Sequence, residues 1–276
     1  MKIILSYFTQ VTNEMPIGAI SIRKVEWTEE VVDWRSNETL ISNAKLLARH
    51  DFLIEDADGF LQVDFANKYI GGGVLDHGAV HEEIRFLITP ELLISLLICE
   101  KMTDNLAFVI TGAQRFSNYT GYGSKLRFCS SPPRREELRD SLGRANVHVV
   151  AMDATPYRRG KAAQYEEAAF KRELVKVCAG FSRNEEDPAR PVATGNWGCG
   201  AFRGDAQLKS LIQLVAAVKT GRDIAYFTFG DRELASDFAR IYECLCNLRV
   251  TIGQLYLWIS EYPGDSSMFS HIEMNC

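Results

Sequence analysis

The sequence predicts an α/β fold in which a sheet is covered by helices on both faces. Short apolar runs alternate along the 276-residue chain with longer segments of helical periodicity. The later runs, such as Leu106–Thr111 and Ile224–Phe229, are apolar at nearly every position, which is typical of strands buried on both faces. Such strands require helices on either side, so the pattern favours a layered α/β domain.

Five strands are expected from these runs. The second alternates apolar and other residues, as a half-buried strand does. The segment before Asp51 is mixed in character, and we assign one strand to it. In chain order, the expected strands are Ala19–Val25, Phe60–Phe65, Leu106–Thr111, Val147–Met152 and Ile224–Phe229.

Helices are expected between and after these strands. The first carries Val80, Ile84 and Leu87 on one face. Pro90 ends it and opens a second helix, because proline lacks an N–H group but suits the first turn. Two further helices are expected over Arg158–Val177 and Leu208–Val218. Another is expected after the cap Gly230-Asp231, and two more after that one. Two charged segments are expected to be exposed insertions, Ser131–Arg139 and Ser182–Arg190.

Composition excludes several functional classes. Hydrophobic residues make up 46% of the chain and charged residues 24%, as in ordinary globular proteins. The net charge of −5 argues against a broad basic face, so direct DNA binding is not expected. No apolar run reaches the length of a membrane span, and the first residues become polar too early for a signal peptide.

The cysteines and histidines give no sign of a metal or cofactor. Seven cysteines are scattered without a CxxC pair, and five histidines show no metal-ligand spacing. We therefore expect reduced thiols in an intracellular protein of the nucleus or cytoplasm. Because the chain is acidic overall, a polyanionic ligand must be held locally by backbone N–H groups and a few side chains.

The first candidate motif is Gly71-Gly72-Gly73, followed after seven residues by His81-Glu82-Glu83. Consecutive glycines let a backbone approach a ligand closely, and the helix start that follows presents N–H groups to an anion. The two adjacent carboxylates are favoured by the helix dipole but repel each other. A flexible turn followed by acidic first-turn residues explains the same pattern equally well.

The second motif is the glycine-rich run Gly195–Asp205, which leads into a strong helix. Backbone donors in such a loop can surround a diphosphate. The run is no Walker loop, because no Gly-Lys-Ser/Thr follows, and it lies too late in the chain for the Rossmann fingerprint. The alternative is a long loop that only enters a helix.

The third motif is Tyr119-Thr120-Gly121-Tyr122-Gly123, which we interpret as a loop. Tyrosines combine an apolar face with a polar tip and suit a clasp over a planar ligand. Taken alone, the segment is better explained as a surface turn. Ligands of α/β folds bind at the carboxyl ends of strands, and there we place this motif together with Asn67–Glu83 and Gly195–Asp205.

Taken together, these segments resemble the animal poly(ADP-ribose) glycohydrolases. The similarity begins near Leu5, extends to the last helices and keeps the order of the family. Five collinear segments carry it: Val63-Asp64-Phe65-Ala66-Asn67-Lys68-Tyr69-Ile70-Gly71-Gly72-Gly73, Glu82-Glu83-Ile84-Arg85-Phe86-Leu87, Tyr119-Thr120-Gly121-Tyr122, Ala193-Thr194-Gly195-Asn196-Trp197-Gly198-Cys199-Gly200-Ala201-Phe202 and Tyr226-Phe227-Thr228-Phe229-Gly230-Asp231.

The resemblance implies a macrodomain-like mixed sheet between helices, with an N-terminal extension. It implies one catalytic domain over residues 1–276, with the macrodomain core at about 50–250. The implied activity is hydrolysis of the ribose–ribose O-glycosidic bonds of poly(ADP-ribose) on modified proteins, mainly from the chain end, with ADP-ribose as product. No cofactor is implied, and we expect a monomer.

The resemblance also implies roles for individual residues. Glu83 matches the catalytic glutamate and Glu82 its substrate-binding neighbour, while Asp64 and Asn67 shape the loop and hold the terminal ribose. Glu55 matches the residue that reads adenine, and Phe229 an aromatic packed at the adenosine. The implied substrate-binding set is Glu55, Asn67, Gly71, Gly72, Gly73, His81, Tyr119, Tyr122, Asn196, Gly198, Cys199, Gly200, Ala201, Phe202 and Phe229, in which Gly200–Phe202 form the diphosphate loop and Tyr122 the clasp.

The implied chemistry suits these residues. One carboxyl group can protonate the leaving ribose oxygen and then accept a proton from the attacking water. Burial and the negative neighbour Glu82 are expected to keep Glu83 protonated before the first step. The bound diphosphate would stabilise the developing positive charge on the sugar.

Two positions depart from the family pattern. His81 replaces a glutamine, and Arg203 stands where glycine is usual. His81 is expected to protonate near pH 6.5, which would favour ionised Glu83 and cause activity to be lost on mild acidification. The alternative function is a non-catalytic ADP-ribose-binding module, in which His81 marks the loss of turnover.

Overall fold

The computed structural model describes the chain except for residues 1, 29–32, 133–137, 158–159, 161, 185–186 and 265. Within the described residues, seven strands form one mixed sheet, in which β4 runs antiparallel to its neighbours and all other neighbouring pairs are parallel. From edge to edge, the strands are β1 (Ser21–Glu26), β4 (Leu106–Thr111), β7 (His148–Asp153), β3 (Leu61–Ala66), β8 (Val192–Gly195), β9 (Ile224–Phe227) and β2 (Leu46–Arg49).

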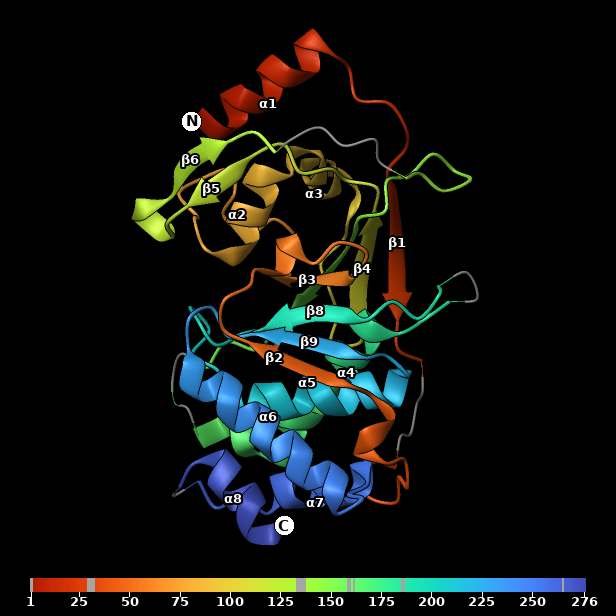
Figure 1. Ribbon diagram of the computed structural model, residues 1–276, viewed down its shortest axis with the longest axis vertical. Helices are drawn as coiled ribbons and strands as arrows, with labels where there is room; N and C mark the ends of the chain where they lie inside the picture. The colour runs from red at the N-terminus through yellow and green to blue at the C-terminus, as the bar shows by residue number, and fades with distance from the viewer. Residues whose placement is uncertain are drawn as a thin grey trace.

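Helices cover both faces of this sheet (Figure 1). On one face α2 packs against β3, and α1 and the short helices η3 and α3 lie around α2. On the other face α4, α5 and α6 pack against the strands, and α7 and α8 form a further layer. The helices of the first face are α1 (Lys2–Asn13), α2 (His81–Ile88), η3 (Pro90–Ile94) and α3 (Ser95–Ile98). Those of the second are α4 (Glu167–Phe181), α5 (Ala206–Thr220), α6 (Arg232–Asn247), α7 (Ile252–Ser260) and α8 (Met268–Asn275).

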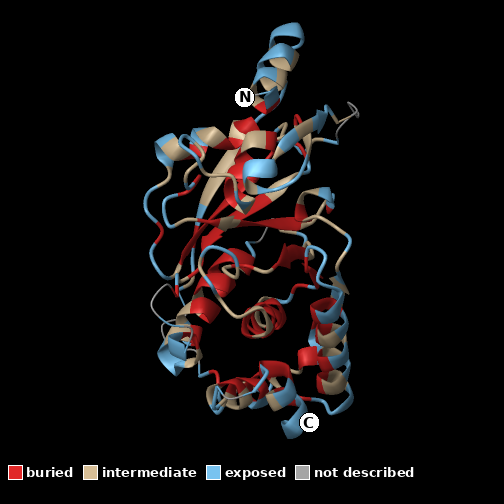
Figure 2. Ribbon diagram, turned by 90° about the vertical axis from the view of Figure 1, so that its left-hand side faces the viewer, coloured by how far each residue is buried: buried red, intermediate tan, exposed pale blue. Residues whose placement is uncertain are grey.

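The core lies on both sides of the sheet, and Figure 2 shows the buried residues concentrated in the middle of the molecule. The larger part joins the sheet to α4–α8 and includes Phe170, Leu211 and Phe238, which are fully buried. The smaller part joins the sheet to α2 and η3 through Phe86 and Leu92. Burial of this apolar surface explains why the strands are apolar at nearly every position.

The sequence predicted these layers and five of the strands. All five lie within one or two residues of their expected bounds, and the expected Asp231 cap accepts a hydrogen bond from the N–H of Leu234. β2 and β8 were missed. β2 is a short edge strand whose residues alternate between partly buried and exposed, and β8 is only four residues long.

Four local expectations were wrong. The helix expected over 158–177 begins at Glu167 as α4, and residues 158, 159 and 161 lie outside the described residues. After Pro90 the chain forms the 3₁₀ helix η3 before α3, and the strand expected to reach Phe229 ends at Phe227. Instead of a loop, segment 119–123 spans part of a hairpin of β5 (Asn118–Thr120) and β6 (Arg127–Ser130), with η4 (Gly123–Lys125) between them.

The two expected insertions lie partly outside the described residues, at 133–137 and 185–186. In the first, Leu138 is exposed. In the second, Asp187 pairs with the buried Arg222, which also donates to the carbonyl of Arg190 at 2.8 Å. At Asp187 and Arg190 the second segment is therefore bonded to the core.

Candidate active site

The loop between β3 and α2 brings two carboxylates together at the start of α2. Both are almost fully buried, and both accept hydrogen bonds from the backbone of this loop. Glu82 accepts from the N–H groups of Asn67 at 2.8 Å and Gly71 at 2.5 Å. Glu83 accepts from those of Gly73 and Val80, both at 2.9 Å. The loop is therefore folded around the two side chains.

Gly72 lies directly against both carboxylates. A Cβ atom at this position would lie 2.6 Å from Glu82 Oε2 and 2.6 Å from Glu83 Oε1. Its φ of 50° is also unfavourable for residues with a side chain. Only glycine lets the backbone pass this close to the acidic pair, which gives the three-glycine motif a specific structural reason.

Asp64 points from β3 into the same buried space. Neither of its carboxylate oxygens has a hydrogen-bond partner among the described residues. Burial, together with the charge of Glu83, raises the pKa of Asp64 to about 7. Burial and the charge of Asp64 raise the pKa of Glu82 to about 10. Asp64 and Glu82 therefore allow the cluster to retain a proton at neutral pH.

Arg85 also belongs to this cluster, although no role was predicted for it from the sequence. It lies one turn after His81 and Glu82 on α2, so it faces the same space, and its side chain is buried. Burial lowers its pKa, whereas the charges of Glu55 and Asp64 oppose that shift. A buried guanidinium partly balances the negative charge of the acids. The i, i+3 spacing of Arg85 from Glu82 was the sequence pattern that indicated a position on the same side of α2.

His81 begins α2 and lies at the site. Its ring stacks on Phe65 at 4.1 Å between centroids, and the N–H of Phe65 donates to its Nδ1 at 3.4 Å. Burial lowers the pKa of His81 to about 4. The expectation that this side chain protonates near pH 6.5 was therefore wrong, since a neutral imidazole persists through mild acidification.

A second group of polar side chains lies beside His81. The hydroxyl of Tyr119 donates to Glu55, in the 3₁₀ helix η2 (Ile54–Asp56), and the charge of Arg85 acts on the same carboxylate. Burial alone would raise the pKa of Glu55, but these contacts hold it below its ordinary value. Its Oε1 is buried without a hydrogen-bond partner in the described chain, so it remains available to a donor group.

Tyr122 lies over the start of α2. Its side-chain oxygen accepts from the backbone N–H of His81, and its side chain is 57% exposed. The N–H of the next residue, Gly123, donates to the carbonyl of Ala79 at 2.9 Å. The hairpin thus reaches the glycine loop, although it does not follow a parallel strand as expected.

The loop after β8 forms a second wall, because β8 pairs in parallel with β3 and both strands end at the same side of the sheet. The side chain of Asn196 accepts from the Tyr226 hydroxyl at 3.0 Å, and the buried Trp197 donates to the carbonyl of Met152 at 2.9 Å. Asp205 caps α5 through the N–H of Leu208. The remaining members of the run are the turn residues Gly198, Cys199, Gly200, Ala201, Phe202 and Arg203.

Three consecutive N–H groups in this wall are free to bind an anion. Those of Gly200, Ala201 and Phe202 donate to no group in the part of the chain that the structure describes. Arg203 follows with a φ of 61° and donates its N–H to Gly200, which closes a tight turn. Its side chain is exposed and forms no ion pair with a described residue. Such an array suits a diphosphate.

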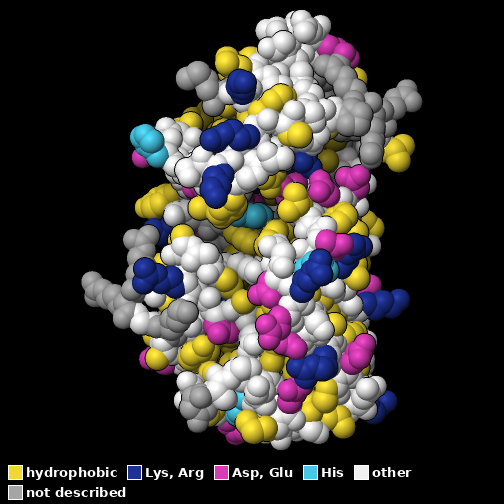
Figure 3. Space-filling model, turned by 60° about the vertical axis from the view of Figure 1, so that its left-hand side comes forward, with side chains coloured by type: hydrophobic (Ala, Val, Ile, Leu, Met, Phe, Trp, Pro, Cys, Tyr) yellow, Lys and Arg dark blue, Asp and Glu magenta, His cyan; other side chains and the backbone are white. Residues whose placement is uncertain are grey.

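Phe229 joins the two walls. It has a φ of 54° and is 40% exposed, and its ring meets those of Phe65 at 6.2 Å and His81 at 6.1 Å. The three rings form an aromatic surface beside Glu55, as stacking of a base requires. Figure 3 shows a hollow at mid-height on one side of the molecule, with hydrophobic side chains around a histidine.

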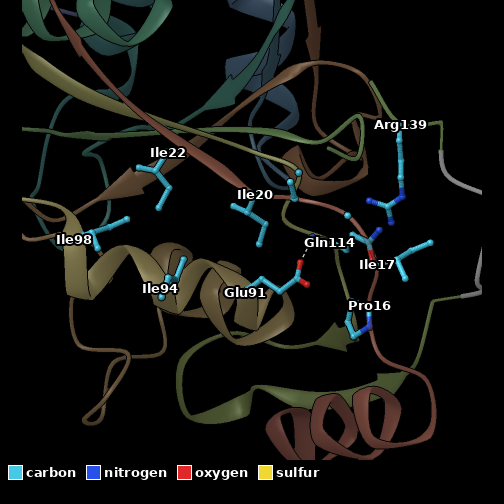
Figure 4. A pocket seen from close by; sticks show the side chains of 12 residues that line it. Pro16, Ile17, Ile20, Ile22, Glu91, Ile94, Ile98, Gln114 and Arg139 are labelled. Atoms are coloured by element: carbon cyan, nitrogen blue, oxygen red, sulfur yellow. Dashed lines mark hydrogen bonds between the residues drawn. The ribbon is translucent and has the colours of Figure 1, made fainter. Parts of the chain in front are cut away.

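The described residues contain no group of three or more histidines, cysteines or acids placed to hold a metal ion. No helix among them is long and apolar enough to cross a bilayer. Another hollow, of about 410 Å³, lies between segment 16–22 and helices η3 and α3 (Figure 4). The candidate catalytic residues do not line it, so it is separate from the site.

A protein-family model matches the chain and agrees with the class of protein that this fold and site define. The model is described as poly(ADP-ribose) glycohydrolase (PARG), macro domain fold, and it matches residues 31–236. The fold is therefore a macrodomain, as the resemblance implied. The chain belongs to the poly(ADP-ribose) glycohydrolase family.

Individual relatives agree with this assignment. Poly(ADP-ribose) glycohydrolases 1 and 2 of Caenorhabditis elegans are 38% and 37% identical to the chain, each over 94% of it. Poly(ADP-ribose) glycohydrolase 1 of Arabidopsis thaliana is 32% identical over 96% of the chain. The matched region covers 35%, 56% and 60% of these relatives, so the chain spans between a third and three fifths of their length.

A solved structure was also matched. It is the poly(ADP-ribose) glycohydrolase of Deinococcus radiodurans in complex with ADP-ribose, with a TM-score of 0.42 and 15% identity. The match covers 82% of this chain and 95% of the other.

Proposed function

We propose that this chain hydrolyses the ribose–ribose O-glycosidic bonds of poly(ADP-ribose) on modified proteins, mainly from the chain end, and releases ADP-ribose. The observation that carries the proposal is the acidic pair Glu82–Glu83, held by the backbone of a glycine loop after β3, together with three free N–H groups in the loop after the neighbouring strand β8. The glycine loop between β3 and α2 would bind the terminal ribose, and the loop after β8 would bind the diphosphate attached to that ribose.

In this mechanism Glu83 acts first as an acid. Each of its oxygens accepts one backbone N–H group, which leaves a further lone pair on each for exchange with the substrate. Glu83 donates a proton to the oxygen of the leaving ribose while the bond from the anomeric carbon to that oxygen breaks. The anomeric carbon gains positive charge, which the nearby diphosphate stabilises.

Glu83 then acts as a base. A water molecule attacks the anomeric carbon, and its proton passes to Glu83, which restores the starting state. Asp64 and Glu82 keep a proton in the cluster at neutral pH because burial raises the pKa of both. Their proposed role is to hold the ribose, and neither gains nor loses a proton over the cycle.

The remaining site residues bind the adenosine in this proposal. Phe229, Phe65 and His81 supply stacking surface, and the free Oε1 of Glu55 accepts from the adenine amino group. Tyr122 closes over the ligand from the hairpin. Asn196, Gly198 and Cys199 support the diphosphate loop.

We further propose that residues 1–276 act as one catalytic unit, as a monomer in the nucleus or cytoplasm, without a cofactor. Helices at both ends of this range support the single catalytic unit, because they pack on the rest of the domain. α1 packs on α2, whereas α8 packs on α6 and α7.

The test is incubation of the protein with automodified poly(ADP-ribose) and chromatography of the products. We expect free ADP-ribose to be released, and little of it with Glu83→Gln. Tight binding of ADP-ribose without any release of product would instead identify a non-catalytic binding module.

A further inference from the structure

A polar hollow of about 480 Å³ lies next to the candidate active site. Its lining includes Lys68, Lys101, Asp104, Asp153, Thr155 and Arg172. It opens where β3 and β7 end, and these two strands pair in parallel, so the hollow lies at the carboxyl edge of the sheet.

Both walls of the candidate active site border this hollow. Lys68 directly follows Asn67, whose N–H binds Glu82. On the opposite side, a Cβ atom at Gly198 would lie 2.6 Å from the Cβ of Ala154, a residue that lines the hollow. The hollow is therefore adjacent in the chain to the first loop and in contact with the second.

The acids of the hollow are already neutralised. Arg172 donates to Asp104 and to Asp153, both at 2.9 Å, and the buried Lys176 contacts Asp153 at 2.7 Å. Arg172 also pairs with Glu173, which has a second cation in Lys209. The acids of the lining therefore offer little repulsion to an anion.

Two cations remain without an acidic partner. Lys68 and Lys101 are exposed, and neither forms an ion pair with any residue that the structure describes. The backbone of Lys68 is fixed, because its carbonyl accepts the N–H of Met102 at 2.8 Å. The ammonium group of Lys68 lies 5.9 Å from the centroid of the Tyr69 ring. Two ammonium groups without acidic partners can bind phosphate as point charges.

We propose that this hollow is a second substrate site, which binds the diphosphate of the ADP-ribose unit on the leaving side of the cleaved bond. The proposal rests on the proposed function. In poly(ADP-ribose) the ribose that leaves Glu83 carries its own diphosphate on the same sugar. That diphosphate must lie close to the cleavage point, and Lys68 and Lys101 in the lining of the hollow supply positive charge without an acidic partner among the described residues.

The experiment compares two substrates that differ only on the leaving side. One is poly(ADP-ribose), and the other is ADP-ribose that carries p-nitrophenol on its anomeric carbon and so lacks a second diphosphate. The variants are Lys68→Gln, Lys101→Gln and the double substitution. Lys45→Gln is the matched control, since Lys45 is exposed and precedes β2 at the opposite edge of the sheet.

We expect each single substitution to lower kcat/KM on the polymer about 3- to 10-fold, as loss of a partly solvated charge-assisted hydrogen bond does. The double variant should lose more, and its kcat/KM should depend less on salt. All variants should cleave the nitrophenyl substrate at the rate of the parent. Equal losses on both substrates, or no loss on the polymer, would overturn the second site.

A binding measurement separates this proposal from the proposed function. In the Glu83→Gln background, the double lysine substitution should weaken affinity for the polymer while leaving affinity for ADP-ribose unchanged. This result does not require turnover, so the second site can hold even where catalysis fails. Unchanged affinity for both ligands would reject it.

Discussion

Neighbouring residues acquire different properties in this site because each backbone position offers different partners. Glu82 and Glu83 are adjacent, yet the loop binds one through Asn67 and Gly71 and the other through Gly73 and Val80. Asp64 lies in the same space with no donor at all in the described chain. Sequence spacing could place these acids together, but it could not assign their hydrogen bonds.

Replacement of Glu83 by glutamine tests the proposed acid and base. The amide cannot cycle a proton, so we expect kcat to fall by roughly 10² to 10⁴. Its NH₂ group cannot accept from the N–H of Gly73 or Val80, so about 1 kcal/mol of stability should also be lost. Affinity for ADP-ribose, measured by calorimetry, should change little. Glu243→Gln on α6 is the control, and turnover equal to that of the parent would show that another residue is the acid.

His81 provides a test by pH. Because burial lowers its pKa to about 4, its charge should not change between pH 5.5 and 7.5. We therefore expect the pH–rate profiles of the parent and His81→Gln to have the same shape over this range. A parent that loses activity near pH 6.5 while the variant does not would show that the imidazole titrates at its ordinary pKa.

At the scale of elements, the β3–α2 loop is the part of the site that the sequence predicted best. Three glycines before two acids indicated a close backbone approach, and the structure gives Gly72 a positive φ and two carboxylate neighbours. The hairpin at 118–130 was predicted poorly. Its strands are short and largely exposed, so their pattern carries little of the alternation that marks a strand.

Substitution of Gly72 by alanine should damage this loop specifically. The added methyl group must displace both carboxylates, so we expect at least a 10²-fold loss of activity and about 1–3 kcal/mol of lost stability. Gly264→Ala is the matched control, because its φ of 82° brings the same backbone strain while no atom lies within 4 Å of the added carbon. Activity assays and thermal unfolding of both variants decide the point, and equal behaviour would exclude a specific role for Gly72.

At the scale of the whole molecule, the fold class was predictable and the electrostatics were not. Buried strands and patterned helices identify the layers, since they depend on periodicity along the chain. The pKa of Asp64 is raised by burial and by the charge of Glu83 and opposed by that of Arg85, and only the folded chain brings these groups to one buried space. Burial of this acid places a cost on the stability of the entire domain.

That cost predicts how stability depends on pH. The pKa of Asp64 is about 7 in the folded protein and about 4 in an unfolded chain, so the folded state binds more protons between these values. Stability should therefore fall as pH rises through this window. Asp64→Asn should gain about 1–3 kcal/mol relative to the parent at pH 8 and show a flatter profile in urea unfolding, while losing activity. Parallel profiles would mean that Asp64 is not protonated in the native state.

The order of strands in the sheet also bears on how the protein is made. β1 and β2 precede the other strands of the sheet in the chain, yet they occupy opposite edges of the finished sheet. β1 must wait for β4, and Leu46 of β2 must wait for Ile224 of β9. Long-range parallel pairing is slow, and its unpaired strands are prone to aggregate. Synthesis of this domain should therefore depend on chaperones that shield β2 until β9 has emerged.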